Sequence, residues 1–157
     1  MEKTNAMRIL DSKKIKYNVY EYPHNDCAVD GITVANLLNE NPKFVFKTLV
    51  CVDNLKKYHV CVVNVEDEID LKKAAKEFNV KSLEMVSLKE LLPLTGYVRG
   101  GCSPIGMKKV FPTIVDKKAI ENEKIIFSGG KIGLQIEMNP LDLNKVLRVD
   151  FKDIRRD

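Results

Sequence analysis

The stretch that decides the fold runs from Lys43 to Val65 and reads KFVFKTLVCVDNLKKYHVCVVNV. Its two halves, residues 43–52 and 56–65, are rich in β-branched and aromatic residues, which favour strands. The four residues at 53–56, Asp-Asn-Leu-Lys, are typical of a turn. The stretch therefore predicts a long antiparallel hairpin.

One lysine interrupts the first strand of this hairpin. Side chains alternate between the two faces of a strand, so Val45, Lys47, Leu49 and Cys51 are expected to share one face. A lysine among apolar neighbours is costly unless its ammonium group reaches a partner or a cavity. Two interpretations follow: an edge-strand lysine whose end reaches solvent, or a functional lysine in a cleft.

The rest of the chain predicts a mixture of helices and strands without strict alternation. Helices are predicted in the opening segment capped by Thr4 or Asn5, in 31–42 capped by Thr33 and stopped by Pro42, in 70–78 capped by Asp70, in 88–92 stopped by Pro93, and in 139–147 capped by Asn139. Further strands are predicted at 17–22, 82–87, 111–116, 124–130 and 131–138. The pattern favours a single α+β domain, residues 1–157, with a mixed, largely antiparallel sheet.

Composition excludes several classes of protein. The 157 residues are 45% hydrophobic and carry a net charge of +4, which permits an anionic partner without requiring one. The chain opens without the features of a signal peptide, and no apolar run approaches the ~20 residues that span a bilayer. The two histidines are isolated and no two cysteines form a CxxC pair, so we expect no metal site, no disulfide framework and a reducing cytoplasm.

Seven of the eight glycines fall in two short segments, 96–106 and 129–133. Such segments form sharp turns, or they expose several backbone N–H groups to one anion or carbonyl oxygen. Neither has the spacing of a P-loop, and no GxGxxG follows a strand, which disfavours nucleotide binding of the usual kinds. Both interpretations, turn and cradle, remain open at this point.

Cys102 lies within the first of these glycine-rich segments. A catalytic cysteine needs a base or an electropositive setting, whereas an unpartnered cysteine is usually a small structural hydrophobe. The lysines of MKKVF and LKKAAK are expected on solvated faces, although they would also suit a phosphate backbone.

Six motifs, in this order, resemble the YbaK family of aminoacyl-tRNA deacylases. They are FKTLV, DLKKAAKEF, TGYVRGGCSPIGMKK, FPTIVD, SGGKIGLQIEMNPLDL and VDFKDI, and together they cover essentially the whole chain. The family is related to the editing domain inserted in bacterial prolyl-tRNA synthetases, and the match is to its free-standing Cys-tRNA(Pro) deacylase branch. The resemblance implies one α+β domain around a barrel-like sheet, and hydrolysis of cysteine wrongly esterified to tRNA(Pro), which a synthetase pocket cannot strongly reject.

The resemblance also assigns roles to particular residues. It places Lys47 near the acceptor end of the tRNA as a catalytic residue, with Gly101 as the second. It implies that the loop N–H groups hold the aminoacyl carbonyl. The expected substrate-binding residues are Tyr22 on the rim, Thr48, Gly100, Cys102, Ser103 and Pro104 of the G-x-x-x-P loop, and Ser128, Gly129 and Gly130 on the facing wall.

The mechanism that the resemblance implies uses the thiol of the substrate's own cysteine, which attacks its ester and leaves as a thiolactone. This requires no metal, cofactor, DNA or membrane, and the expected partners are the aminoacyl-tRNA acceptor end and a prolyl-tRNA synthetase complex. Ile132 stands where many relatives carry Arg. The alternatives are a non-catalytic module that binds aminoacyl-tRNA or a synthetase, an editing enzyme for another amino acid, and a redox sensor acting through Cys102.

Overall fold

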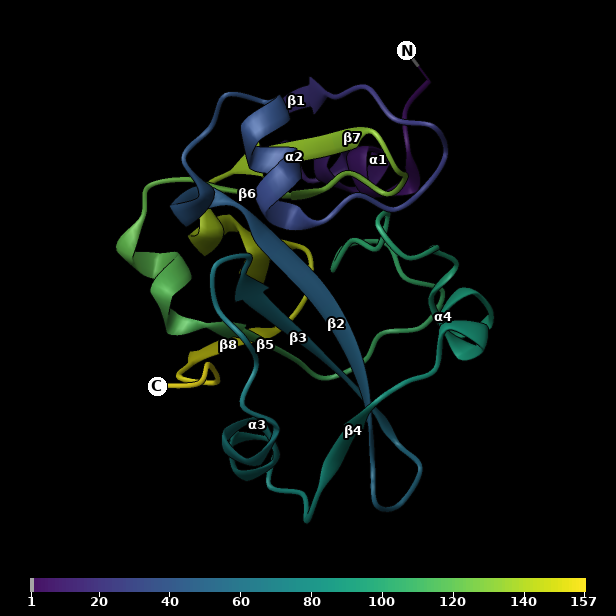
Figure 1. Ribbon diagram of the computed structural model, residues 1–157, viewed down its shortest axis with the longest axis vertical. Helices are drawn as coiled ribbons and strands as arrows, with labels where there is room; N and C mark the ends of the chain where they lie inside the picture. The colour runs from purple at the N-terminus through teal and green to yellow at the C-terminus, as the bar shows by residue number, and fades with distance from the viewer. Residues whose placement is uncertain (1) are drawn as a thin grey trace.

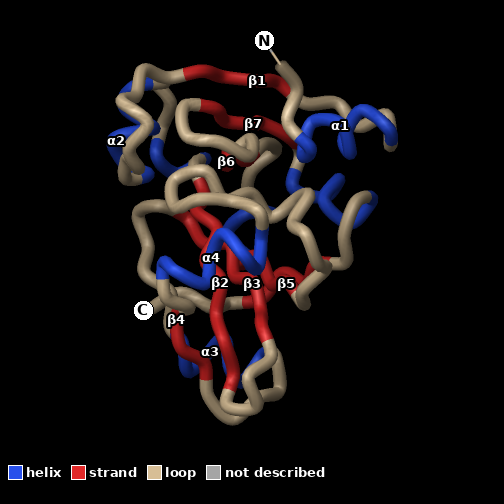
Figure 2. The backbone as a smooth tube through the Cα atoms, turned by 90° about the vertical axis from the view of Figure 1, so that its right-hand side faces the viewer, coloured by secondary structure: helices blue, strands red, loops and turns tan. Residues whose placement is uncertain are grey.

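The computed structural model describes residues 2–157, which form two β-sheets with helices around them (Figure 1). A three-stranded antiparallel sheet has the order β1-β7-β6, and a five-stranded mixed sheet has the order β4-β2-β3-β5-β8. The smaller sheet lies above the larger one in both views, with α3 at the far end of the larger sheet (Figure 2). The predicted α+β class is confirmed.

The predicted hairpin is confirmed and forms the centre of the larger sheet. Strands β2 (Phe46–Asp53) and β3 (Tyr58–Asn64) pair antiparallel. Strand β4 (Leu83–Met85) pairs antiparallel with the last three residues of β2 only. On the other side, β5 (Thr113–Asp116) and β8 (Val149–Lys152) add in parallel. The short strand β8 was missing from the strands predicted from sequence.

The smaller sheet contains β1 (Asn18–Glu21), β6 (Ile125–Ser128) and β7 (Leu134–Met138). An isolated parallel bridge between Val45 and Ile126 links it to the larger sheet. The expected barrel-like closure is wrong, because β6 ends only two residues beyond this bridge and the glycines that follow turn the chain back into β7. No strand remains there to continue the pairing with β2.

Helices α1 (Asn5–Ser12) and α2 (Gly31–Leu37) lie on opposite faces of the smaller sheet (Figure 1). Thr4 caps α1 as expected, accepting a hydrogen bond from the Met7 N–H at 3.3 Å. The predicted cap of α2 is wrong: Asp30 accepts from the Thr33 N–H at 2.9 Å and from its hydroxyl at 2.7 Å. A carboxylate three residues upstream outcompetes the hydroxyl as a cap acceptor because its bonds are charge-assisted.

Two further helices flank the larger sheet: α3 (Leu71–Glu77), which Asp70 caps as predicted, and α4 (Leu88–Thr95). Pro93 lies inside α4 instead of ending it, and the helix stops at Gly96, which has a φ of 84°. Three short 3₁₀ helices are η1 (Pro42–Phe44), η2 (Lys117–Glu121) and η3 (Pro140–Lys145). The last replaces the α-helix predicted at 139–147, although its predicted cap, Asn139, is confirmed.

The main hydrophobic core lies between the two sheets and α1, and a second, smaller cluster lies between the larger sheet and α3. Cys51 and Cys61 are fully buried in the second cluster, as expected of structural thiols, and all four cysteines are free. Among the described residues, no helix combines the length and the apolar character needed to cross a membrane.

Candidate active site

A cavity of about 100 Å³ opens where the two sheets meet. Val45 and Ile126 form the parallel bridge, so the next residues on the same side of each strand are Lys47 and Ser128. Both line the cavity, and neither is covered by a continuing strand. The opposite wall is apolar and is built by valines of α2 and its surroundings: Val29, Val34 and Val65.

Lys47 projects into this cavity from the middle of the molecule. Its face of β2 is the predicted one, and β4 pairs with β2 only from Cys51 onward, so the lysine is not shielded by that strand. The side chain is half-buried and makes no hydrogen bond or ion pair with any of residues 2–157. Lys47 therefore lies at an edge of β2 that β4 leaves unpaired and also lines the cavity, with its ammonium group unengaged among the described residues.

Glycines let three loops meet at the rim of the cavity. Gly100 has a φ of +85°, and a Cβ there would lie 2.9 Å from the Cα of Ala28. A Cβ on Gly101 would lie 2.9 Å from the Cα of Lys131. The loop 98–104 thus touches both the loop before α2 and the loop between β6 and β7. The glycine-rich segments are turns, and they also build the rim.

Most glycine N–H groups in these loops are already engaged. The Gly101 N–H donates to the Val98 carbonyl at 3.0 Å, and the Gly130 N–H donates to Ser128 Oγ at 3.1 Å. The N–H of Gly129 donates to the Leu134 carbonyl. By contrast, the N–H groups of Gly100 and Cys102 have no acceptor among the described residues, and both residues line the cavity. The free backbone donors of this loop at the cavity are therefore those of Gly100 and Cys102, while Gly101 packs closely against Lys131.

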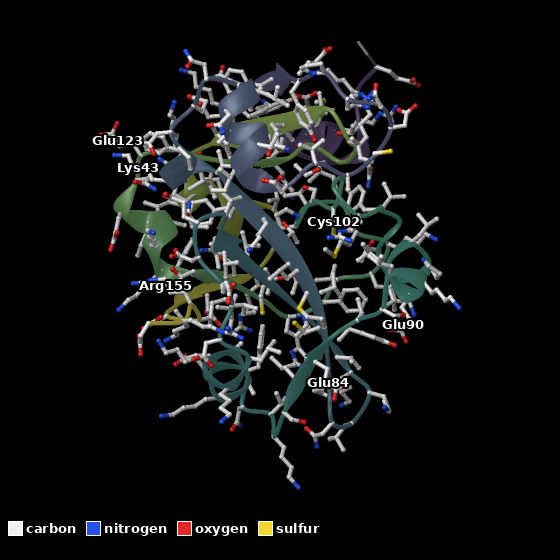
Figure 3. All side chains as sticks on the ribbon, in the orientation of Figure 1. Lys43, Glu84, Glu90, Cys102, Glu123 and Arg155 are labelled. Atoms are coloured by element: carbon white, nitrogen blue, oxygen red, sulfur yellow. The ribbon has the colours of Figure 1, made fainter. Side chains whose placement is uncertain are left out.

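The Cys102 thiol is poorly suited to act as a nucleophile. Burial raises the pKa of this thiol to about 12, against a smaller opposing effect of a hydrogen bond with Thr95. The reactive thiolate is therefore scarce at neutral pH. No histidine, aspartate or glutamate is among the residues that line the cavity in the described chain. Figure 3 labels Cys102 on the loop that joins α4 to β5.

The remaining predicted residues shape the site from outside the cavity. Ser103 is fully buried and its Oγ accepts from the Ile105 N–H at 3.2 Å, which holds the loop from behind. Pro104 lines a different cavity on that side. Tyr22 faces a neighbouring hollow of about 250 Å³, and its N–H donates to the Gly133 carbonyl at 2.9 Å. The structure thus brings Lys47, Thr48, Gly100, Cys102 and Ser128 together at the cavity and places Tyr22, Gly101, Ser103, Pro104, Gly129 and Gly130 around it.

Comparison with known proteins agrees with this geometry. The residue pattern of the family described as the aminoacyl-tRNA editing domain matches residues 29–146, which include every residue that lines the cavity. The chain belongs to the aminoacyl-tRNA editing family.

Relatives of this editing domain cover nearly its full length. The provisionally assigned Cys-tRNA(Pro)/Cys-tRNA(Cys) deacylase EbsC of Enterococcus faecalis is 42% identical over 153 residues, which are 98% of this chain and 93% of EbsC. A crystal structure provisionally assigned as a trans-editing enzyme for prolyl-tRNA synthetase superposes with a TM-score of 0.81 at 21% identity, over 100% of both chains. The crystal structure of the hypothetical protein APE2540 gives a TM-score of 0.85 at 17% identity, over 98% of this chain and 100% of that one. These two structures support the fold.

Sequence reasoning missed several residues of the editing-domain cavity. Val29, Val34, Val65 and Gln135 line it without having been singled out. The valines carry no signal that distinguishes them from core residues. Gln135 carries no such signal either, because it alternates with Leu134 and Ile136 as on the polar face of an ordinary strand.

Proposed function

We propose that this editing domain is a deacylase that removes cysteine from mischarged tRNA(Pro). The observation that supports it best is the chemical character of the cavity. It offers a free ammonium group, hydroxyls and free backbone N–H groups, yet among residues 2–157 its lining contains no carboxylate or imidazole, and its one thiol is held protonated. Such a site can bind and polarise an ester, but it has no group of its own to attack the ester or to act as a base.

The attacking group is therefore supplied by the substrate. The cysteine thiol of the aminoacyl ester attacks its own carbonyl carbon, a C–S bond forms, and the C–O bond to the terminal ribose breaks. The thiol proton leaves with the ribose oxygen, so the products are a thiolactone and uncharged tRNA. The Cys102 N–H stabilises the charge that develops on the carbonyl oxygen, while Lys47 holds the terminal phosphate or ribose.

The cavity receives only the aminoacyl end, since its volume of about 100 Å³ is below the ~150 Å³ that holds a benzene molecule in an engineered core. The anticodon lies too far away to be recognised there. Selection of tRNA(Pro) would then come from a complex with prolyl-tRNA synthetase in the cytoplasm.

Single-turnover deacylation of Cys-tRNA(Pro) tests this function with wild type, Lys47→Ala and Lys57→Ala. Lys57 is an exposed lysine at the hairpin turn and serves as the matched control. Loss of a charge-assisted contact, worth ~1.5–3 kcal/mol, should slow Lys47→Ala by roughly 10- to 150-fold and leave Lys57→Ala unchanged. If Ser-tRNA or Ala-tRNA were deacylated as fast as Cys-tRNA, the thiolactone route would be refuted. If the wild-type protein bound the acceptor end without deacylating it, the protein would be a binding module instead of an enzyme.

A further inference from the structure

A cluster of charged residues lies on the same face of the smaller sheet as part of the cavity, and α2 lies over this face (Figure 1). Lys124 comes just before β6, and alternation places it on the side of Ile126 and Ser128. Their partners on β7 are Glu137 and Gln135. The pair formed by Ser128 and Gln135 lines the cavity. Lys124 and Glu137 therefore mark the opposite end of the face that α2 covers.

At that end, Lys124 is bonded to two carboxylates. Its Nζ lies 3.0 Å from Glu137 Oε2 and 3.0 Å from Glu40 Oε1. Glu137 also accepts hydrogen bonds from Asn18 Nδ2 and from the Tyr20 hydroxyl, each at 2.9 Å. Hydrogen bonds with Glu137 and Glu40 raise the pKa of Lys124 above its ordinary value, so its ammonium group stays charged. Lys124 thus links the sheet to the segment that follows α2.

Glu40 is held firmly to the end of α2. Asn39 has a φ of 56°, which turns the chain back, and the Glu40 N–H then donates to the Ala35 carbonyl at 2.9 Å. Ala35 is fully buried, and its neighbour Val34 lines the cavity. A movement of Glu40 would therefore be passed through the helix backbone to the apolar wall of the cavity.

Few other contacts fix α2 among the residues that the structure describes. Two of its seven residues, Val34 and Ala35, are buried. The apolar cluster beneath it has three buried members, Ala35, Val45 and Ile126. A helix of two turns is not stable by itself and depends on its packing. The bond from Lys124 to Glu40 is therefore a substantial part of what holds α2 in place.

The elements that this cluster joins each supply one residue to the cavity: Val34 from α2, Ser128 from β6 and Gln135 from β7. We propose that Lys124 is a positioning residue that, through Glu40, pins α2 to β6 and β7 and so fixes the width of the cavity. Without this tether α2 moves away from the sheet more easily, and the cavity accepts larger acyl groups. The inference rests on the proposed function, in that the cavity is taken to hold the acyl group of an aminoacyl-tRNA.

The test measures the preference for a small acyl group with two stable probes. Adenosine carrying cysteine or methionine through a 3′-amide cannot be deacylated, so the two Kd values do not depend on catalysis. Lys124→Met keeps the length of the side chain without its charge, and Glu40→Ala cuts the link to α2 but leaves the bond between Lys124 and Glu137. Lys73→Met is the matched control, because Lys73 also pairs with two carboxylates but lies on α3, outside the cavity lining.

Melting temperatures establish which variants are folded at the assay temperature. Lys124→Met leaves Glu137 with the bonds from Asn18 and Tyr20, so we expect it to fold. If it does not, Glu40→Ala carries the test alone. A merely structural ion pair would lower Tm in the Lys124 and Lys73 variants alike without changing the ratio of the two Kd values.

One extra methylene in an apolar pocket is worth ~10- to 200-fold, so wild type should bind the cysteinyl amide at least about 10-fold more tightly than the methionyl amide. This preference should fall about two- to fivefold in Lys124→Met and Glu40→Ala, the size of one partly exposed ion pair. It should stay as in wild type in Lys73→Met.

An unchanged preference in either of the folded tether variants, or an equal fall in Lys73→Met, would overturn the proposal. A wild-type protein that binds both amides equally, or neither, would overturn it as well. Deacylation of Cys-tRNA(Pro) by wild type is measured in parallel. If deacylation is absent while the amide preferences change as expected, the deacylase proposal fails and the tether is supported.

Discussion

Gly101→Ala tests whether close packing between two loops holds the site in shape. The added Cβ would lie 2.9 Å from Lys131 Cα and 3.0 Å from both Lys131 C and Ile132 N. Carbon atoms in good contact are ~3.5–4.0 Å apart, so the loops must separate by roughly 0.5–1 Å. All three obstacles are backbone atoms, so no side-chain rotation relieves the clash.

Two measurements follow from this displacement. Overpacking of this kind costs ~1–3 kcal/mol, which for a chain of this length lowers Tm by about 2–12 °C. A misplacement of ~1 Å can cost about 100-fold in rate, so we expect single-turnover deacylation to fall by roughly 10- to 100-fold at a temperature where the variant is folded. The assays are thermal denaturation and Cys-tRNA deacylation on the same preparations.

Gly96→Ala is the matched control. Gly96 has a φ of +84° at the end of α4, and its added Cβ would meet only the flexible side chain of Lys108 at 3.3 Å. The backbone strain costs ~1–2 kcal/mol, so its Tm should fall by a similar amount while its rate stays at that of wild type. A Gly101→Ala protein with normal rate and Tm, or equal rate losses in both variants, would refute the packing argument.

Two further predictions concern titratable groups. Brief treatment of the folded protein with iodoacetamide at neutral pH should label Cys27 alone. Cys51 and Cys61 are buried, and burial raises the pKa of Cys102 to about 12. Early modification of Cys102, detected by peptide mass spectrometry, would contradict this prediction. Hydrogen bonds from His59 and from backbone N–H groups lower the pKa of Asp53, so its contribution to stability is present above the unfolded pKa of ~3.9 and is lost as the pH falls through the folded value. Asp53→Asn should therefore weaken the acid dependence of unfolding by denaturant, and an unchanged pH profile would count against that assignment.

The sequence predicted the fold where the signal is local. The 43–65 hairpin and the Asp70 cap depend on residues close in the chain, and both are confirmed. Predictions failed where distant or competing contacts decide. The parallel addition of β8 to β5 depends on pairing across about 35 residues, and Asp30 displaced Thr33 as a cap because two plausible caps lie in one turn.

The site was predictable to the extent that polar residues interrupt apolar strands. Lys47 stood out for this reason, whereas Gln135 did not, because it alternates with apolar residues as on the polar face of an ordinary strand. The valine wall could not be foreseen, because valines facing a cavity and valines facing a core look alike in sequence. Nor does sequence reveal that the Gly101 N–H is engaged while that of Cys102 is free, since this depends on the path of the loop.

The two sheets do not close into a barrel, and this open join between β2 and β6 accounts for the position of the site. Had β6 continued past the Val45–Ile126 bridge alongside β2, the backbone groups around Lys47 and Ser128 would have been hydrogen-bonded strand neighbours and their side chains packed as in any sheet. Because β6 instead turns back at Gly129, the two strands part and leave polar side chains around open space. The glycine loops then close this space only at its rim. The cavity is thus a consequence of where β6 ends.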